Sequence, residues 1–219
     1  MALFIGDTMY PYKASYTPAD DDTDGFANDV TAASGVALAL AATNAGDSLA
    51  HLVIITPSGS ITGSFVITGT DASGLSQTET LATDTVNAVT SVKYYKTLTS
   101  VTAPSGLGAE TVDIGWTDDI VTLTFPLNWR QKNFQVSLAV DISGTISYTV
   151  QHTFNQLQPN SNVTPPLNAA DYAWWPHATL VTKTTDADGN YASPVTATRI
   201  LINSLTAGAT ITQYITQGA

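Results

Sequence analysis

The chain of 219 residues carries 7 Lys and Arg against 18 Asp and Glu, a formal net charge of −11, and it has no cysteine. Phosphate and anionic headgroups are bound by basic surfaces, so this balance argues against nucleic acid and against an anionic membrane surface as direct partners. Without cysteine the chain has no disulfides, no thiolate chemistry and no Cys-based zinc site.

Charged residues make up only 11% of the chain, against roughly 25% in an average soluble domain. This is typical of a β protein with a neutral polar surface, or of surfaces that pack against other copies, because charge is depleted at interface cores. Residues 1–7 have no basic region and no long apolar core, and no apolar run is long enough for a membrane span. We therefore expect a soluble protein that is made in a cytoplasm.

Residues 1–30 contain aromatic side chains without periodicity and an acidic cluster at residues 20–24. Prolines in this segment favour extended or turn conformations. We expect an extended N-terminal arm that lies on a neighbouring subunit or, alternatively, a lead-in segment over its own sandwich. The candidate interface residues in this segment are Tyr10, Tyr12, Tyr16 and Phe26.

The middle of the chain reads as a series of strands. We expect strands at residues 36–42, where a short helix is the alternative, and at 49–56. Residues 64–81 predict a β-hairpin, because alternating apolar residues flank an Asp- and Gly-containing turn. Half-buried strands follow at 91–101 and 112–116, and residues 117–119 are expected to form a joint between two halves.

The second half repeats this rhythm. A strand is expected at 120–125, and residues 134–140 and 146–152 predict a second hairpin around Ser143 and Gly144. A long Asn-, Gln- and Pro-rich loop over 156–170 precedes the closing strands at 195–203 and 209–216. The fold class predicted is all-β, with one or two antiparallel β-sandwich or jelly-roll-like units, 31–117 and 118–219, which could also be one continuous domain.

The sequence contains no strong catalytic or metal-binding motif. No two of the three histidines, His51, His152 and His177, have metal-ligand spacing, and core or surface positions are expected for them. The segments 20–25 and 186–190 resemble parts of calcium loops but lack the spaced ligands and closing Glu of an EF-hand. No Gly-x-Ser-x-Gly elbow occurs. We expect no enzyme activity, no cofactor and no metal, although a cation between subunits at residues 20–24 stays open.

The densest aromatic patch lies at residues 172–177. Tyr172, Trp174 and Trp175 are predicted to anchor a core or an interface, because buried aromatic side chains dominate the energetics of both. The alternative is a carbohydrate platform formed by the same three residues.

Several of these segments carry a resemblance to a known group of proteins. Residues 65–81 (FVITGTDASGLSQTETL) and 92–101 (VKYYKTLTSV) resemble a module that is common in virion proteins of tailed bacteriophages. In the second half, residues 147–154 (SYTVQHTF), 174–177 (WWPH) and 186–199 (DADGNYASPVTATR) are similar to proteins encoded among head and neck genes. The resemblance covers roughly residues 36–216.

The resemblance implies structural work in a virion and supplies no catalytic residues. It implies a capsid decoration (cement) protein that binds the major capsid protein on the capsid surface as a homo-oligomer, a dimer or a trimer. A head–tail connector, tail or fibre component is the nearest alternative, and a carbohydrate- or receptor-binding module is the alternative from another class.

Overall fold

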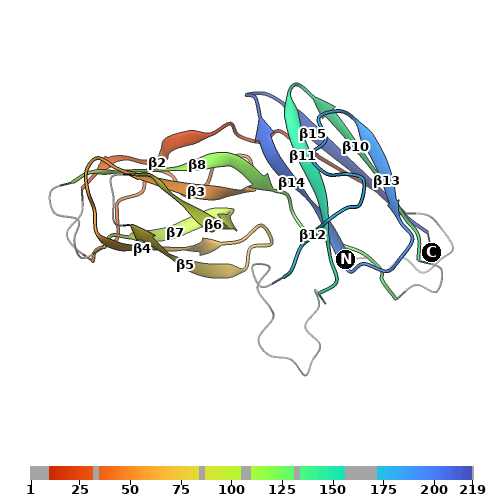
Figure 1. Ribbon diagram of the computed structural model, residues 1–219, viewed down its shortest axis with the longest axis horizontal. Helices are drawn as coiled ribbons and strands as arrows, with labels where there is room; N and C mark the ends of the chain where they lie inside the picture. Colours follow the sequence, from red (N-terminus) through yellow and green to blue (C-terminus); the bar gives the residue numbers. More distant parts are fainter. Residues whose placement is uncertain are drawn as a thin grey trace. The chain divides into compact units, whose positions relative to one another are not determined.

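The computed structural model describes residues 10–31, 35–83, 87–104, 110–130, 134–155 and 172–218. All regular structure in these residues is β, without a helix, which confirms the predicted all-β class (Figure 1). The strands are β1 (Tyr10–Tyr16), β2 (Asp22–Val30), β3 (Ala50–Pro57), β4 (Gly63–Thr70), β5 (Ser76–Thr83), β6 (Val89–Tyr95), β7 (Thr97–Thr102), β8 (Val112–Val121), β9 (Phe125–Pro126), β10 (Val136–Ser143), β11 (Ile146–Thr153), β12 (Trp175–Pro176), β13 (Ala187–Tyr191), β14 (Ala197–Leu205) and β15 (Thr210–Gln217). The predicted loop at 156–170 lies outside the described residues.

The chain divides into two compact units, and one interrupts the other. The inserted unit runs from residue 18 to 123. The flanking unit combines residues 10–17 with the described residues after 123. This differs from the predicted units 31–117 and 118–219, because β1 belongs with the C-terminal strands and the chain passes between the units six residues later than expected.

The inserted unit consists of two antiparallel sheets. One has the order β2-β8-β3-β6, and the other has the order β5-β4-β7. Figure 1 shows β2, β8 and β3 in one layer and β4, β5 and β7 in the other. Alternate residues of the strands, such as Val53, Ile55, Phe65 and Ile67, point inward and are fully buried. The unit is therefore a β-sandwich-like structure with its own core.

The first predicted hairpin is confirmed. β4 and β5 pair from Gly63–Thr83 to Thr70–Ser76. Their turn is closed by Asp71, whose Oδ1 accepts hydrogen bonds from the backbone N–H groups of Ser73 (2.8 Å) and Leu75 (2.9 Å). Gly74 follows with φ +83°, a left-handed conformation that costs glycine little.

Three predictions for this unit are wrong. Residues 91–101 are not one strand, because β6 ends at Tyr95 and pairs with β3, whereas β7 begins at Thr97 and pairs with β4 in the other sheet. Residues 36–42 form neither a strand nor a short helix, and only Ala37 makes an isolated bridge, to Thr102. Residues 117–119 are not a joint, because β8 continues through them to Val121. The reason is that Ile120 and Val121 pair with β3 and are buried, so this end of β8 completes the core.

The flanking unit also has two antiparallel sheets. One has the order β1-β15-β10-β13, and the other joins β12, β11, β14 and β9. The strands predicted around Ser143 and Gly144 exist, but they are not a hairpin: β10 pairs with β15 and β13, whereas β11 pairs with β14 and β12. The turn thus crosses from one sheet to the other, and the turn between β14 and β15 does the same.

The expected extended arm is replaced by two strands over residues 10–30. β1 pairs with β15 along its whole length, and β2 pairs irregularly with β8. The physical reason is that each strand completes the edge of a sheet within its own unit, so its backbone groups find partners without a neighbouring subunit. Residues 1–9 lie outside the described residues.

Candidate functional site

An exposed group of rings lies on β11 and β12 of the flanking unit. We call Phe154, Trp175 and His152 the aromatic patch. Trp175 is 43% exposed and Phe154 is 55% exposed. Their ring centroids are 5.3 Å apart, and His152 lies against both rings, at 5.2 Å from Phe154 and 6.5 Å from Trp175. Backbone pairing positions the patch, because His152 on β11 is opposite Trp175 on β12.

The aromatic patch packs against two further rings, Tyr191 and His177. His152 makes an edge contact with Tyr191, and Tyr191 makes one with His177. Burial of the His152 ring, together with the nearby His177, lowers the pKa of His152. The neutral imidazole is therefore the favoured form, and its buried Nδ1 has no hydrogen-bond partner among the described residues. The exposed rings of Phe154 and Trp175 thus pack against a neutral imidazole.

Trp174 is held differently from Trp175. The guanidinium carbon of Arg199 lies 4.0 Å from the centre of the Trp174 ring, and Arg199 Nε donates a hydrogen bond to Gln151 Oε1 (2.8 Å). Arg199 therefore occupies one face of this indole by a cation–π contact. Phe154 and Trp175, for their part, are tilted by 57° to each other. These two exposed rings are therefore not coplanar.

The predicted interface residues are not all available to a partner. Phe26 is buried in the core of the inserted unit, 4.7 Å from the Trp116 ring. Tyr12 on β1 is half-buried and packs against Phe125 at 4.1 Å. Burial, followed by the nearby Tyr12, raises the pKa of Tyr16, so its phenol stays protonated. Tyr10 lies opposite Gln217 at the start of β1.

The predicted aromatic residues at 172–175 lie closer to the surface than Phe26 does. Tyr172 and Trp174 are half-buried and Trp175 is exposed. Sequence reasoning missed Phe154 and His152 as their neighbours. The available signal was the alternation of β11, which places His152 at the end of a strand and Phe154 directly after it.

The spatial grouping of acidic and histidine side chains determines whether the described residues can bind a metal ion. No group of three or more His, Cys, Asp or Glu in the described part of the chain could hold a metal ion. Residues 22–24 belong to β2 and residues 187–190 to β13, so neither acidic segment forms a calcium loop. The described residues contain no helix that is long and apolar enough to cross a membrane.

The closest histidine–carboxylate pair has a structural role. His51 Nε2 lies 2.9 Å from Asp47 Oδ2, and both side chains are buried. Asp47 also accepts hydrogen bonds from the backbone N–H groups of Ala19 (2.8 Å) and Leu49 (2.9 Å). His51 Nδ1 is 3.0 Å from the carbonyl oxygen of Thr117. The pair thus joins three segments of the inserted unit.

The chain matches no protein-family model and has no significant match among curated proteins.

Proposed function

We propose that the chain is a structural protein of a tailed-bacteriophage virion that decorates the capsid by binding the shell of the major capsid protein. The observation that carries the proposal is the exposed aromatic patch on an all-β protein in which only 11% of the residues are charged. Large aromatic side chains surrounded by neutral surface are the usual anchors of protein–protein contacts. The phage assignment is supported by the resemblance of residues 65–81, 92–101, 147–154, 174–177 and 186–199 to virion proteins.

The aromatic patch is the proposed contact with the shell. Trp175 and Phe154 together present two large rings that are only half-covered by the chain itself. Covering them by a partner removes apolar surface from water, which stabilises the complex by about 25 cal/mol per Å². The net charge of −11 keeps the protein from binding the packaged DNA.

The first test is the binding of Trp175→Ala and Phe154→Ala variants to purified capsids that lack this protein. We expect each variant to bind at least about tenfold more weakly, as for the loss of an interface anchor. Trp129→Ala is the matched control, because Trp129 is also exposed (39%) and also lies in the flanking unit. Unchanged binding by both patch variants would contradict the proposed contact.

The copy number of the chain in purified virions tests the place in the particle. A copy number of the same order as that of the major capsid protein supports decoration as a dimer or trimer. A far smaller number favours the head–tail connector, tail or fibre alternative. Absence from the particle contradicts the virion proposal as a whole.

A further inference from the structure

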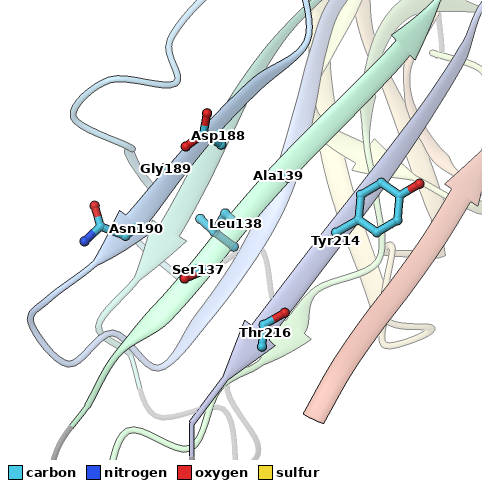
Figure 2. Close-up of a pocket in the computed structure, with 8 residues that line it drawn as sticks. All are labelled: Ser137, Leu138, Ala139, Asp188, Gly189, Asn190, Tyr214 and Thr216. Atoms are coloured by element: carbon cyan, nitrogen blue, oxygen red, sulfur yellow. The ribbon is translucent and has the colours of Figure 1, made fainter. Parts of the chain in front are cut away.

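A hollow of about 340 Å³ lies on the four-stranded sheet of the flanking unit (Figure 2). Strand pairing arranges its outward side chains in two rows across β13, β10 and β15. The rows are Asn190, Ser137 and Thr216, and then Asp188, Ala139 and Tyr214. Ser and Ala on the central strand are short and their neighbours are longer. The hollow therefore follows β10, and we call it the β10 groove.

The two walls of the β10 groove differ in chemistry. Figure 2 shows Asp188 and Asn190 on β13 at one side of β10, and Tyr214 and Thr216 on β15 at the other. One wall thus offers a carboxylate and an amide, and the other offers an aromatic ring and a hydroxyl. Lys13 Nζ lies 5.4 Å from the centre of the Tyr214 ring.

Gly189 and His177 fix the wall formed by β13. Gly189 lies between Asp188 and Asn190 and faces inward, where a Cβ would come within 2.9 Å of His177 Cε1. His177 Nε2 lies 3.2 Å from the carbonyl oxygen of Asn190. Because Gly189 permits this close approach, the two polar side chains beside it point out of the sheet at fixed positions.

Hydrogen-bonding capacity is left unused in the β10 groove. Outside the groove, some polar side chains of the same sheet are paired within the chain: Ser15 with Thr212 (2.9 Å between hydroxyl oxygens), and Asp186 with the backbone N–H of Ile142 (2.8 Å). In the described part of the chain, by contrast, the side chains of Asp188 and Asn190 make no hydrogen bond to protein groups. Both side chains are therefore free to bond a ligand in the groove.

We propose that the β10 groove is a binding site for a neutral saccharide. Sugar hydroxyl groups both donate and accept hydrogen bonds, so they match a carboxylate acceptor, an amide and the three hydroxyls of Ser137, Tyr214 and Thr216 in one short groove. The apolar C–H face of a pyranose ring packs against an aromatic side chain such as Tyr214. The volume of about 340 Å³ lies at the lower end of the range for small-molecule sites. A site for one or two sugar rings follows.

The charge of the groove excludes other ligand classes. Asp188 lies in it, and Asp141 is exposed on the same strand as Ser137 and Ala139, against one nearby cation, Lys13 at the Tyr214 ring. The two carboxylates outnumber this cation, so an anionic sugar, phosphate or nucleic acid is disfavoured. The groove has no apolar wall for a hydrophobic peptide. It runs on the face of a sheet rather than at its edge, so a peptide cannot add to it as a further strand.

The test is an amide-resolved NMR titration of the full chain with a panel of trisaccharides. The neutral probes are maltotriose, cellotriose, mannotriose and chitotriose, and trigalacturonate is the anionic comparison. We expect at least one neutral probe to shift the amide signals of β10, β13 and β15 around the groove. Trigalacturonate should bind at least about tenfold more weakly than that probe, because of Asp188.

Matched variants assign the binding to the groove. Asp188→Asn should weaken the binding by about tenfold, since it removes a charge-assisted hydrogen bond. Asp141→Asn, a neighbouring carboxylate outside the lining, should leave it within about twofold. Ala139→Leu should abolish it by filling the floor, and its amide spectrum shows directly whether the sheet is retained. The proposal is overturned if no neutral probe shifts these signals, if Asp188→Asn and Ala139→Leu bind normally while folded, or if the shifts lie at Trp175 and Phe154.

Discussion

At the scale of single residues, Asp47 and His51 show how a buried histidine–carboxylate pair can serve the fold. Both ring nitrogens of His51 and both carboxylate oxygens of Asp47 already have partners inside the inserted unit. Neither side chain has a free atom directed at a substrate. The pair instead ties the start of the unit, at Ala19, to β3 and to the middle of β8.

This pair predicts an acid-sensitive contribution to stability. Burial alone would raise the pKa of Asp47, but the hydrogen bond and charge of His51, with the two backbone N–H donors, lower it overall. A carboxyl whose pKa is lower in the folded than in the unfolded chain stabilises the fold above the unfolded value, and this contribution is lost as the pH falls below about 4. We expect the free energy of unfolding of the inserted unit to decrease in this range.

Chemical denaturation between pH 3 and pH 6 measures the effect. Asp47→Asn should be less stable near neutral pH and should lose about 1–2 kcal/mol less than the parent on acidification, since it cannot be protonated. Asp21→Asn, which removes an exposed carboxylate nearby, should keep the parent's slope. Equal slopes for the parent and Asp47→Asn would contradict the assignment.

At the scale of elements, β6 has an edge that is closed by side chains instead of another strand. Glu79 on β5 accepts hydrogen bonds from the backbone N–H groups of Val92 (2.8 Å) and Lys93 (3.0 Å). Gln77 Nε2 donates to the carbonyl oxygen of Tyr94 (2.6 Å). β5 and β6 belong to different sheets, so these bonds join the two layers of the inserted unit along one side.

Glu79→Gln should loosen this side of the sandwich. An amide replaces one of two acceptor oxygens by a donor, so one backbone N–H of β6 loses its protein partner, at a net cost of about 1 kcal/mol. Hydrogen exchange at the amides of Val92 and Lys93 should become faster. Glu110→Gln is the matched control, because Glu110 accepts one bond, from the exposed Ser58 hydroxyl (3.2 Å). Unchanged protection in Glu79→Gln would show that the carboxylate does not hold the edge.

The elements also show which parts of the fold are local in the sequence. The β4–β5 hairpin was predictable because Asp71 and Gly74 determine the turn within a few residues. The strands β10 and β11 were equally visible, but their partners were not. Buried and exposed residues alternate in the same way in a strand that pairs with its sequence neighbour and in one that packs across the core from it. The sequence therefore predicts a hairpin at Gly144, where the chain crosses between two sheets.

The candidate sites also combine features that are local in the sequence with features that depend on distant strands. Trp174 and Trp175 were visible as a dense aromatic segment, but their different exposure depends on Arg199, from a strand distant in sequence. The β10 groove was not predictable at all. It requires Ser137, Asp188 and Thr216 to lie side by side, and that arrangement is set only by the pairing of three separate strands.

At the scale of the whole molecule, residues 10–16 are a structural part of the flanking unit. β1 covers one edge of β15 over seven residue pairs and places Tyr12 against Phe125. The sequence predicts an extended N-terminal arm over residues 1–30, on a neighbouring subunit or over its own sandwich. The observed pairing leads to a different expectation.

Deletion of residues 1–17 should destabilise the flanking unit selectively. β15 would lose its partner, so amides of β15 and β10 should lose protection from hydrogen exchange, while those of β3 and β8 in the inserted unit should keep it. Deletion of residues 1–9, which leaves β1 intact, is the control. Full protection of β15 in the longer deletion would mean that β1 does not contribute to the unit.

The partnership of β1 and β15 also determines the order in which the chain can fold during translation. β1 precedes the inserted unit in the chain and its partner β15 follows it, with Tyr10 opposite Gln217, whereas the strands of the inserted unit are synthesised one after another. The inserted unit can therefore complete its core on the nascent chain before β15 is made, and β1 has to wait for β15. Throughout this interval β1 is an unpaired strand, so a slow ribosome or crowded polysomes would favour its exchange between neighbouring nascent copies.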